Sequence, residues 1–102
     1  MNRQLTFASQ ARAELQDAIA WYERQKPGLG QEFLGEARVC LQRIHEQPSM
    51  GSRLKGAADV EGVRRLLMER FPYAVIYRER GNEVRVLAVA HTRRRPGYWW
   101  RR

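Results

Sequence analysis

The chain has 102 residues, of which 43% are apolar and 29% are charged, and its formal net charge is +8. Domains of about 100 to 150 residues are the commonest size, so these values predict a single compact domain over residues 1–102 and exclude a multidomain enzyme. No apolar run approaches the roughly 20 residues that cross a bilayer, which excludes a membrane span.

The cysteine, the histidines and the first residues further restrict the class of protein. The one cysteine, Cys40, cannot form an internal disulfide, and two histidines offer no zinc-ligand spacing. We therefore expect neither a metal nor a cofactor. Met1 to Gln4 lead into no apolar signal core, so we expect a cytoplasmic protein with no membrane partner.

The first half of the chain predicts one strand and two helices. Leu5 and Phe7 alternate with more polar neighbours, which predicts a strand over residues 3–8. Amphipathic helices are predicted over 10–25 and 29–46, with a Pro-Gly turn between them. They form a helical hairpin with apolar stripes at Ala11, Leu15, Ala18, Ile19, Tyr22, Leu29, Phe33, Ala37, Cys40, Leu41 and Ile44.

The second half predicts a loop and three strands. Residues 49–61 show neither helical nor strand period and read as a loop. Strands are predicted over 62–70, 73–80 and 83–91, and they form a meander because short turns at Phe71-Pro72 and Gly81-Asn82 join them. In the last strand a simple alternation places Val84, Val86, Ala88 and Ala90 on one face. The predicted fold is α+β, in the order β-α-α-β-β-β, with the helical hairpin packed on a small, mostly antiparallel sheet.

The positive charge belongs entirely to the second half of the chain. Residues 1–51 hold six basic and six acidic side chains, whereas residues 52–102 hold thirteen basic and five acidic ones. Seventeen of the nineteen basic residues are arginine, whose planar guanidinium suits phosphate and carboxylate groups. The distribution indicates an anionic partner, and the alternative is a surface charge that serves only solubility.

The segment 91–102 has the most unusual composition. It contains five arginines, three aromatic rings, one histidine and no acidic residue. This mixture can stack on bases and neutralise phosphates, or anchor the segment on a protein surface. The alternative is that Tyr98, Trp99 and Trp100 fold back to cap the sheet while the arginines are solvated.

A basic patch on one side of the sheet is a second candidate site. Arg64 and Arg65 point to opposite faces of their strand, so one of them reaches the face that the helices leave free. The patch would be completed by Lys55, Arg78, Arg85, Arg93 and Arg94. Cross-strand pairing with Glu61, Glu69, Glu79 and Glu83 is the alternative role of the strand arginines.

Metal-free RNA cleavage would need a base, an acid and a cation for the developing phosphorane charge. Arginine supplies only the cation, because it does not deprotonate. The candidates for proton transfer are His91, Tyr98 and Lys55, and Glu61 and Glu69 are weaker candidates. For His91 the alternative is a structural hydrogen bond at the end of a strand.

Nearly the whole sequence resembles the bacterial toxins of the RelE/ParE superfamily, the toxic partners of type II toxin-antitoxin pairs. The resemblance is carried, in order, by Ala20-Trp21-Tyr22-Glu23, Pro27-Gly28-Leu29-Gly30 with Phe33, Val63-Arg64-Arg65, Phe71-Pro72-Tyr73 with Ile76-Tyr77-Arg78, and Leu87-Ala88-Val89-Ala90-His91 leading to Arg93-Arg94-Arg95-Pro96. The Phe-Pro-Tyr strand and the His91, Arg94 and Pro96 ending are more similar to the ParE, or plasmid stabilisation, branch. Arg95 departs from the pattern, because many relatives carry an acidic or small residue before this proline.

The resemblance implies two possible targets. ParE-like members poison DNA gyrase and are not enzymes, whereas RelE-like members cut messenger RNA on the ribosome. For the second activity the resemblance implies that Lys55, Arg65 and Tyr98 stand for the basic residues and the tyrosine of RelE-like members, with Arg65 stabilising charge. It therefore implies a gyrase-inhibiting toxin, with a messenger RNA endonuclease and a non-toxic binding domain as the alternatives. An acidic antitoxin is the implied partner, and it would cover the same basic surface. The residues expected to contact partner or target are Arg64, Arg65, Arg78, Arg85, Arg93, Arg94, Tyr98, Trp99 and Trp100.

Overall fold

The computed structural model describes residues 3–54, 62–94 and 98–101. Its elements in chain order are β1 (Gln4–Phe7), α1 (Ser9–Gln25), α2 (Leu29–Glu46), the 3-10 helix η1 (Pro48–Met50), β2 (Ser52–Arg53), β3 (Val63–Leu67), β4 (Tyr73–Arg80), β5 (Glu83–His91) and the 3-10 helix η2 (Tyr98–Arg101). The predicted α+β class and the β-α-α-β-β-β order are confirmed. The bounds predicted for α2, β4 and β5 coincide with the observed ones.

The five strands form one sheet in the order β1-β5-β4-β3-β2. The meander of β3, β4 and β5 is antiparallel as predicted, and β1 joins the edge of β5 in parallel. The prediction of a loop over 49–61 was wrong for its first residues, and residues 55–61 lie outside the described part of the chain. Pro48–Met50 form η1, and Ser52–Arg53 pair with Arg65 and Arg64 of β3 as the edge strand β2.

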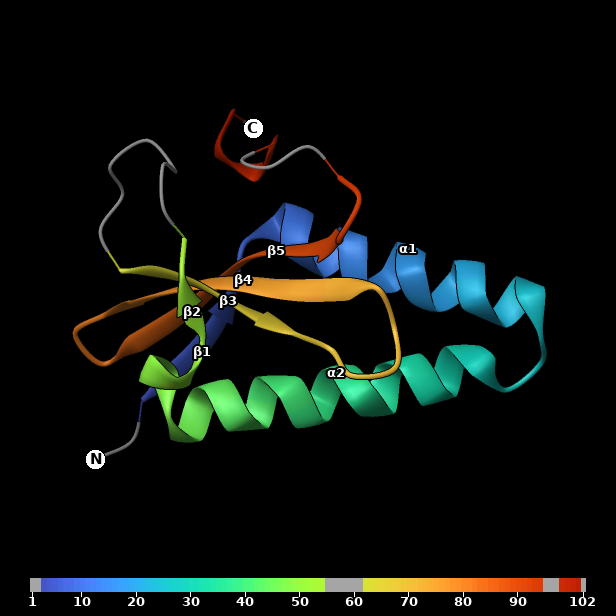
Figure 1. Ribbon diagram of the computed structural model, residues 1–102, viewed down its shortest axis with the longest axis horizontal. Coiled ribbons are helices and arrows are strands. Elements are labelled where there is room, and N and C mark those ends of the chain that lie inside the picture. Colours follow the sequence, from blue (N-terminus) through green and yellow to red (C-terminus); the bar gives the residue numbers. More distant parts are fainter. Residues whose placement is uncertain (1–2, 55–61, 95–97, 102) are drawn as a thin grey trace.

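Both helices pack on the same face of the sheet, and the predicted apolar stripes supply their contacts. Every predicted stripe residue belongs to the main core cluster or packs against it, and the same cluster contains Val75, Tyr77, Val84 and Val86 of the sheet. Figure 1 shows α2 along one side of the sheet and η2 on the opposite side. None of the helices in the described part of the chain has the length and apolar character of a membrane span.

The turn between the helices depends on two glycines and one carboxylate. Gly28 adopts φ 91°, a left-handed conformation that glycine tolerates best. A Cβ on Gly30 would lie 2.6 Å from the Ile19 carbonyl oxygen, so glycine permits the close approach of α2 to α1. The Glu23 carboxylate accepts hydrogen bonds from the N–H groups of Gly28 and Gly30 at 2.9 and 3.0 Å. Its negative charge also stabilises α2, because it lies at the positive, N-terminal end of the helix dipole.

A β-bulge in β5 corrects the predicted alternation of that strand. Tyr77 of β4 lies opposite Val86 and the preceding Ile76 lies opposite Ala88, so Leu87 is an extra residue in β5. Val84 and Val86 therefore face the helices, whereas Ala88 and Ala90 belong to a second cluster on the opposite face. The prediction that these four residues share a face was wrong, because the bulge shifts the period by one residue.

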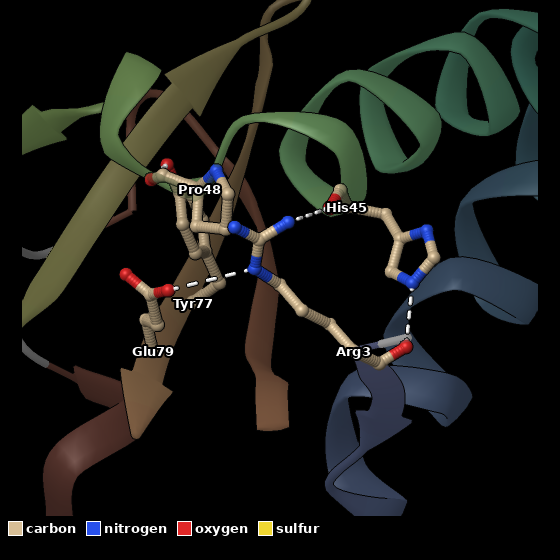
Figure 2. Close-up of polar contacts among 5 residues, drawn as sticks. All are labelled: Arg3, His45, Pro48, Tyr77 and Glu79. Carbon is tan, nitrogen blue, oxygen red and sulfur yellow. Dashed lines mark hydrogen bonds and ion pairs between the residues drawn. The ribbon is translucent and has the colours of Figure 1, made fainter. Parts of the chain in front are cut away.

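The N-terminal strand is tied to the end of α2 by a reciprocal contact. Nε2 of His45 lies 2.7 Å from the Arg3 carbonyl oxygen, and the Arg3 guanidinium donates to the His45 carbonyl at 3.3 Å. The same guanidinium lies 3.7 Å from the Glu79 carboxylate (Figure 2). Through these contacts Arg3, the residue before β1, joins the end of α2 to β4. His45 and Glu79 therefore both have structural roles.

Candidate functional site

The face of the sheet opposite the helices carries a group of arginines. Arg78 lies directly across from Arg85 in the register of β4 and β5, and Arg65 lies across from Ile76, which packs in the open-face cluster. Residues that are opposite each other in a sheet share a face, so Arg65, Arg78 and Arg85 project to this side. We refer to these three residues as the open-face arginines.

The open-face arginines are accessible to a partner. Arg65 and Arg85 are exposed, Arg78 is half-buried, and none of the three forms an ion pair within the described part of the chain. Their alternative role, cross-strand pairing with glutamate, is not observed among the described residues, and Glu61 lies outside them. Glu79 instead contacts Arg3, Glu69 contacts Arg43, and Glu83 accepts a hydrogen bond from the Thr6 hydroxyl at 2.8 Å.

Arg64 lies on the other face and has a structural contact. Its guanidinium donates a hydrogen bond of 2.8 Å to the Gly51 carbonyl, and its register partner is the buried Tyr77. The Tyr77 hydroxyl donates to the Pro48 carbonyl at 2.6 Å and accepts from the Gly51 N–H at 3.0 Å. Burial raises the pKa of Tyr77, so this hydroxyl stays protonated as the network requires. Arg64 thus helps to hold η1 and β2 against β4.

The C-terminal residues fold back onto the sheet. Trp99 is only 6% exposed and packs with Val63, Ile76, Ala88 and Ala90 on the open face. This position matches the alternative role, capping of the sheet, and a partner could reach Trp99 only if the segment left the sheet. The side chain of Trp100, also a predicted contact residue, lies outside the described part of the chain.

Tyr98 and Arg94 lie at the boundary between this segment and α1. The Tyr98 hydroxyl donates a hydrogen bond of 2.5 Å to the Glu14 carboxylate. The Arg94 guanidinium stacks over the Tyr98 ring at 3.8 Å from its centroid, a cation–π contact. Arg93 and Arg94 are both exposed, and Arg94 lies beside side chains of α1, including Glu14 and Asp17.

A groove of about 520 Å³ lies between α1, the ends of β4 and β5, and the C-terminal segment. Its walls include His91, Arg94 and Tyr98 together with two carboxylates, Glu14 and Asp17. Nδ1 of the His91 ring accepts a hydrogen bond of 3.0 Å from the Arg93 N–H, and the ring packs against Tyr73 with centroids 5.2 Å apart. His91 therefore has the structural contacts that the sequence offered as its alternative role.

The residues considered for RNA cleavage are divided between the two faces of the sheet. His91 pairs with Tyr73, which belongs to the helix-side core, whereas Arg65 lies on the open face. Lys55 and Glu61 lie outside the described residues. Two carboxylates beside His91 and Tyr98 also disfavour a phosphate in that groove.

Other reactive groups are few in the described part of the chain. No three histidine, cysteine, aspartate or glutamate side chains there gather as metal ligands. Cys40 is a core residue, as its place on the helical stripe predicted, and burial raises its pKa to about 11. Its thiol is therefore protonated at neutral pH and is not poised as a nucleophile.

Sequence reasoning missed Glu14, which touches β5 as well as the C-terminal segment. Its carboxylate accepts hydrogen bonds from the Val89 N–H and the Tyr98 hydroxyl. The partners lie 75 and 84 residues away along the chain, and nothing in the amphipathic pattern distinguishes Glu14 from other polar positions of α1.

Comparisons with known proteins agree with this architecture. Residues 5–96 match the family model described as ParE toxin of the type II toxin-antitoxin system, parDE. A solved structure described as the chromosomal ParDE TA system from P. aeruginosa is similar, with a TM-score of 0.73 and 21% sequence identity. The similarity covers 87% of this chain and 95% of that one, and at this identity it shows the fold. No curated protein matched the sequence.

Proposed function

Because the chain belongs to the ParE toxin family of type II toxin-antitoxin systems, we propose that it inhibits DNA gyrase and that a cognate antitoxin neutralises it. The proposed contact surface consists of the open-face arginines together with Arg93, Arg94 and the arginine-rich residues that follow. The observation that carries the proposal is that Arg65, Arg78 and Arg85 share the open face of the sheet and form no ion pair within the described part of the chain. The proposed site of action is the cytoplasm.

Charge explains why an antitoxin would cover this surface. The net charge of +8 arises entirely from residues 52–102, the half that forms the meander and the C-terminal segment. An extended acidic chain can lie along an open sheet face and neutralise several arginines at once. Burial of the same arginines by the antitoxin would block the target, since one surface cannot hold both.

The test of the target is a supercoiling and DNA cleavage assay with purified gyrase. We expect the chain to inhibit supercoiling or trap double-strand breaks, and we expect added antitoxin to reverse the effect. Primer-extension mapping of RNA from expressing cells runs beside it. Site-specific RNA cuts without an effect on gyrase would refute the gyrase proposal and favour the endonuclease. The absence of both effects would refute it as well and favour a non-toxic binding domain.

Charge reversal tests the surface. Arg65→Glu and Arg78→Glu are expected to weaken both antitoxin binding and gyrase inhibition, because each replaces a cation of the contact surface by a repelling anion. Arg38→Glu is the matched control, since Arg38 is an exposed arginine on α2, on the other side of the sheet. If the control weakens both activities as strongly as the sheet variants, only net charge matters and the proposed surface is wrong.

A further inference from the structure

On the edge of β5 that pairs with β1, no strand of the described part of the chain lies beside β5 after Val86. The short strand β1 pairs with β5 from Gln4 to Phe7, and its last contact is the Ala8 N–H bonded to the Val86 carbonyl at 2.9 Å. The chain then turns away into α1, whereas β5 continues to His91. Backbone groups at such an edge need another partner, because an unsatisfied polar group within a fold is costly.

Glu14 of α1 supplies this partner. One oxygen of its carboxylate, Oε1, accepts a hydrogen bond of 3.0 Å from the Val89 N–H, the amide group just beyond the bulge. The other oxygen, Oε2, accepts the Tyr98 hydroxyl at 2.5 Å. The half-buried carboxylate of Glu14 therefore joins α1 to the edge of β5 and to the C-terminal segment. Both hydrogen bonds have a charged acceptor, and such bonds are stronger than those between neutral groups.

The neighbours of Tyr98 extend this connection to both sides of the segment. Arg94, before it in the sequence, stacks on the ring that Glu14 holds by its hydroxyl. Trp99, the next residue, is buried on the open face of the sheet. Tyr98 thus anchors the segment at the edge of β5, and Trp99 anchors it on the open face of the sheet.

We propose that Glu14 is a positioning residue, which docks the C-terminal segment against β5 through Tyr98 and so fixes the position of Arg94, which stacks on the Tyr98 ring. The effect on activity rests on the gyrase inhibition proposed above, whereas the docking itself does not. Docking is therefore measured first, by a property of the free protein.

Amide hydrogen exchange of the full chain, followed by NMR, measures docking residue by residue. Tyr98→Phe removes only the hydroxyl, and we expect the amide of Trp99 to exchange at least tenfold faster while the Val89 amide, still bound by Glu14, is unchanged. Glu14→Ala is expected to accelerate both amides. Asp17→Ala is the matched control, because Asp17 is one turn further along α1, lines the same groove and has no described bond to the segment.

The double variant tests whether the two side chains act together. If Glu14 acts through Tyr98, the double variant exchanges at Trp99 no faster than Glu14→Ala alone. Unchanged exchange at Trp99 in both single variants would overturn the docking role, and so would multiplied effects in the double variant or acceleration by Asp17→Ala. A chain that fails to inhibit gyrase would refute the proposed function and leave these exchange results interpretable.

Activity then tests the positioning role. We expect Tyr98→Phe to reduce gyrase inhibition at least tenfold at unchanged global stability, since Arg94 is retained but no longer held in position. Equal inhibition by Tyr98→Phe and the parent chain, with exchange at Trp99 accelerated, would show that the docked position is not needed and would overturn that part of the proposal.

Discussion

Tyr77→Phe tests the polar network that holds η1 and β2 to the sheet. Tyr77 is fully buried, and its hydroxyl satisfies both the Pro48 carbonyl and the Gly51 N–H. Phenylalanine keeps the ring but leaves both backbone groups, which belong to buried residues, without this partner. The variant therefore isolates the contribution of one hydroxyl group.

The expected cost follows from these two hydrogen bonds. A buried donor or acceptor left unsatisfied costs about 1–3 kcal/mol, so we expect the free energy of unfolding to fall by about 2 kcal/mol when some water enters to replace the hydroxyl. For a domain of this size that loss lowers the melting temperature by roughly 10 °C. The Gly51 amide should also lose protection from hydrogen exchange.

Urea denaturation of parent and variant measures the loss, and Tyr73→Phe is the matched control. Tyr73 also lies on β4 and packs against the helix-side core, but its hydroxyl has no hydrogen bond among the described residues. We expect the control to change stability by less than about 0.5 kcal/mol. The reasoning is refuted if the two variants are equally stable or if the Gly51 amide stays protected in Tyr77→Phe.

Three further predictions concern the helix contact, alkaline pH and the charged face. Gly30→Ala should destabilise the fold by about 1–3 kcal/mol in denaturant melts, because its Cβ would meet the Ile19 carbonyl, and an unchanged midpoint would contradict the close contact. Burial raises the pKa of Tyr77 above 10.0 in the folded state, so the unfolded chain releases the phenolic proton first as pH rises. The stability of the parent should therefore fall above about pH 10, and melts from about pH 9 to 11 should show a larger loss for the parent than for Tyr77→Phe. Antitoxin binding by the parent should weaken steeply with salt in titration calorimetry, and Arg78→Glu should show a shallower salt dependence than Arg38→Glu.

The sequence by itself determined the two helices, the N-terminal strand, the three strands of the meander and the helical half of the core, but not η1, β2 or η2. Helical spacing marked every residue of the two stripes that pack on the sheet, because the period of 3.6 residues depends only on local geometry. The Pro-Gly turn and the Gly81-Asn82 turn fixed the element boundaries in the same way, since they restrict the backbone locally. The concentration of charge after residue 52 was also visible without a structure.

Only the tertiary structure decided which side chains share a surface. The bulge at Leu87 reversed the faces of Ala88 and Ala90, and no sequence pattern marks a bulge that arises from pairing with β4. The different roles of the two neighbouring arginines also depend on tertiary structure. Arg64 donates to the Gly51 carbonyl, which the contact of Gly51 with Tyr77 positions, whereas Arg65 has no ion pair among the described residues. Contacts across 75 or more residues, such as those of Glu14, depend on how the whole chain folds back, and local periodicity carries no information about them.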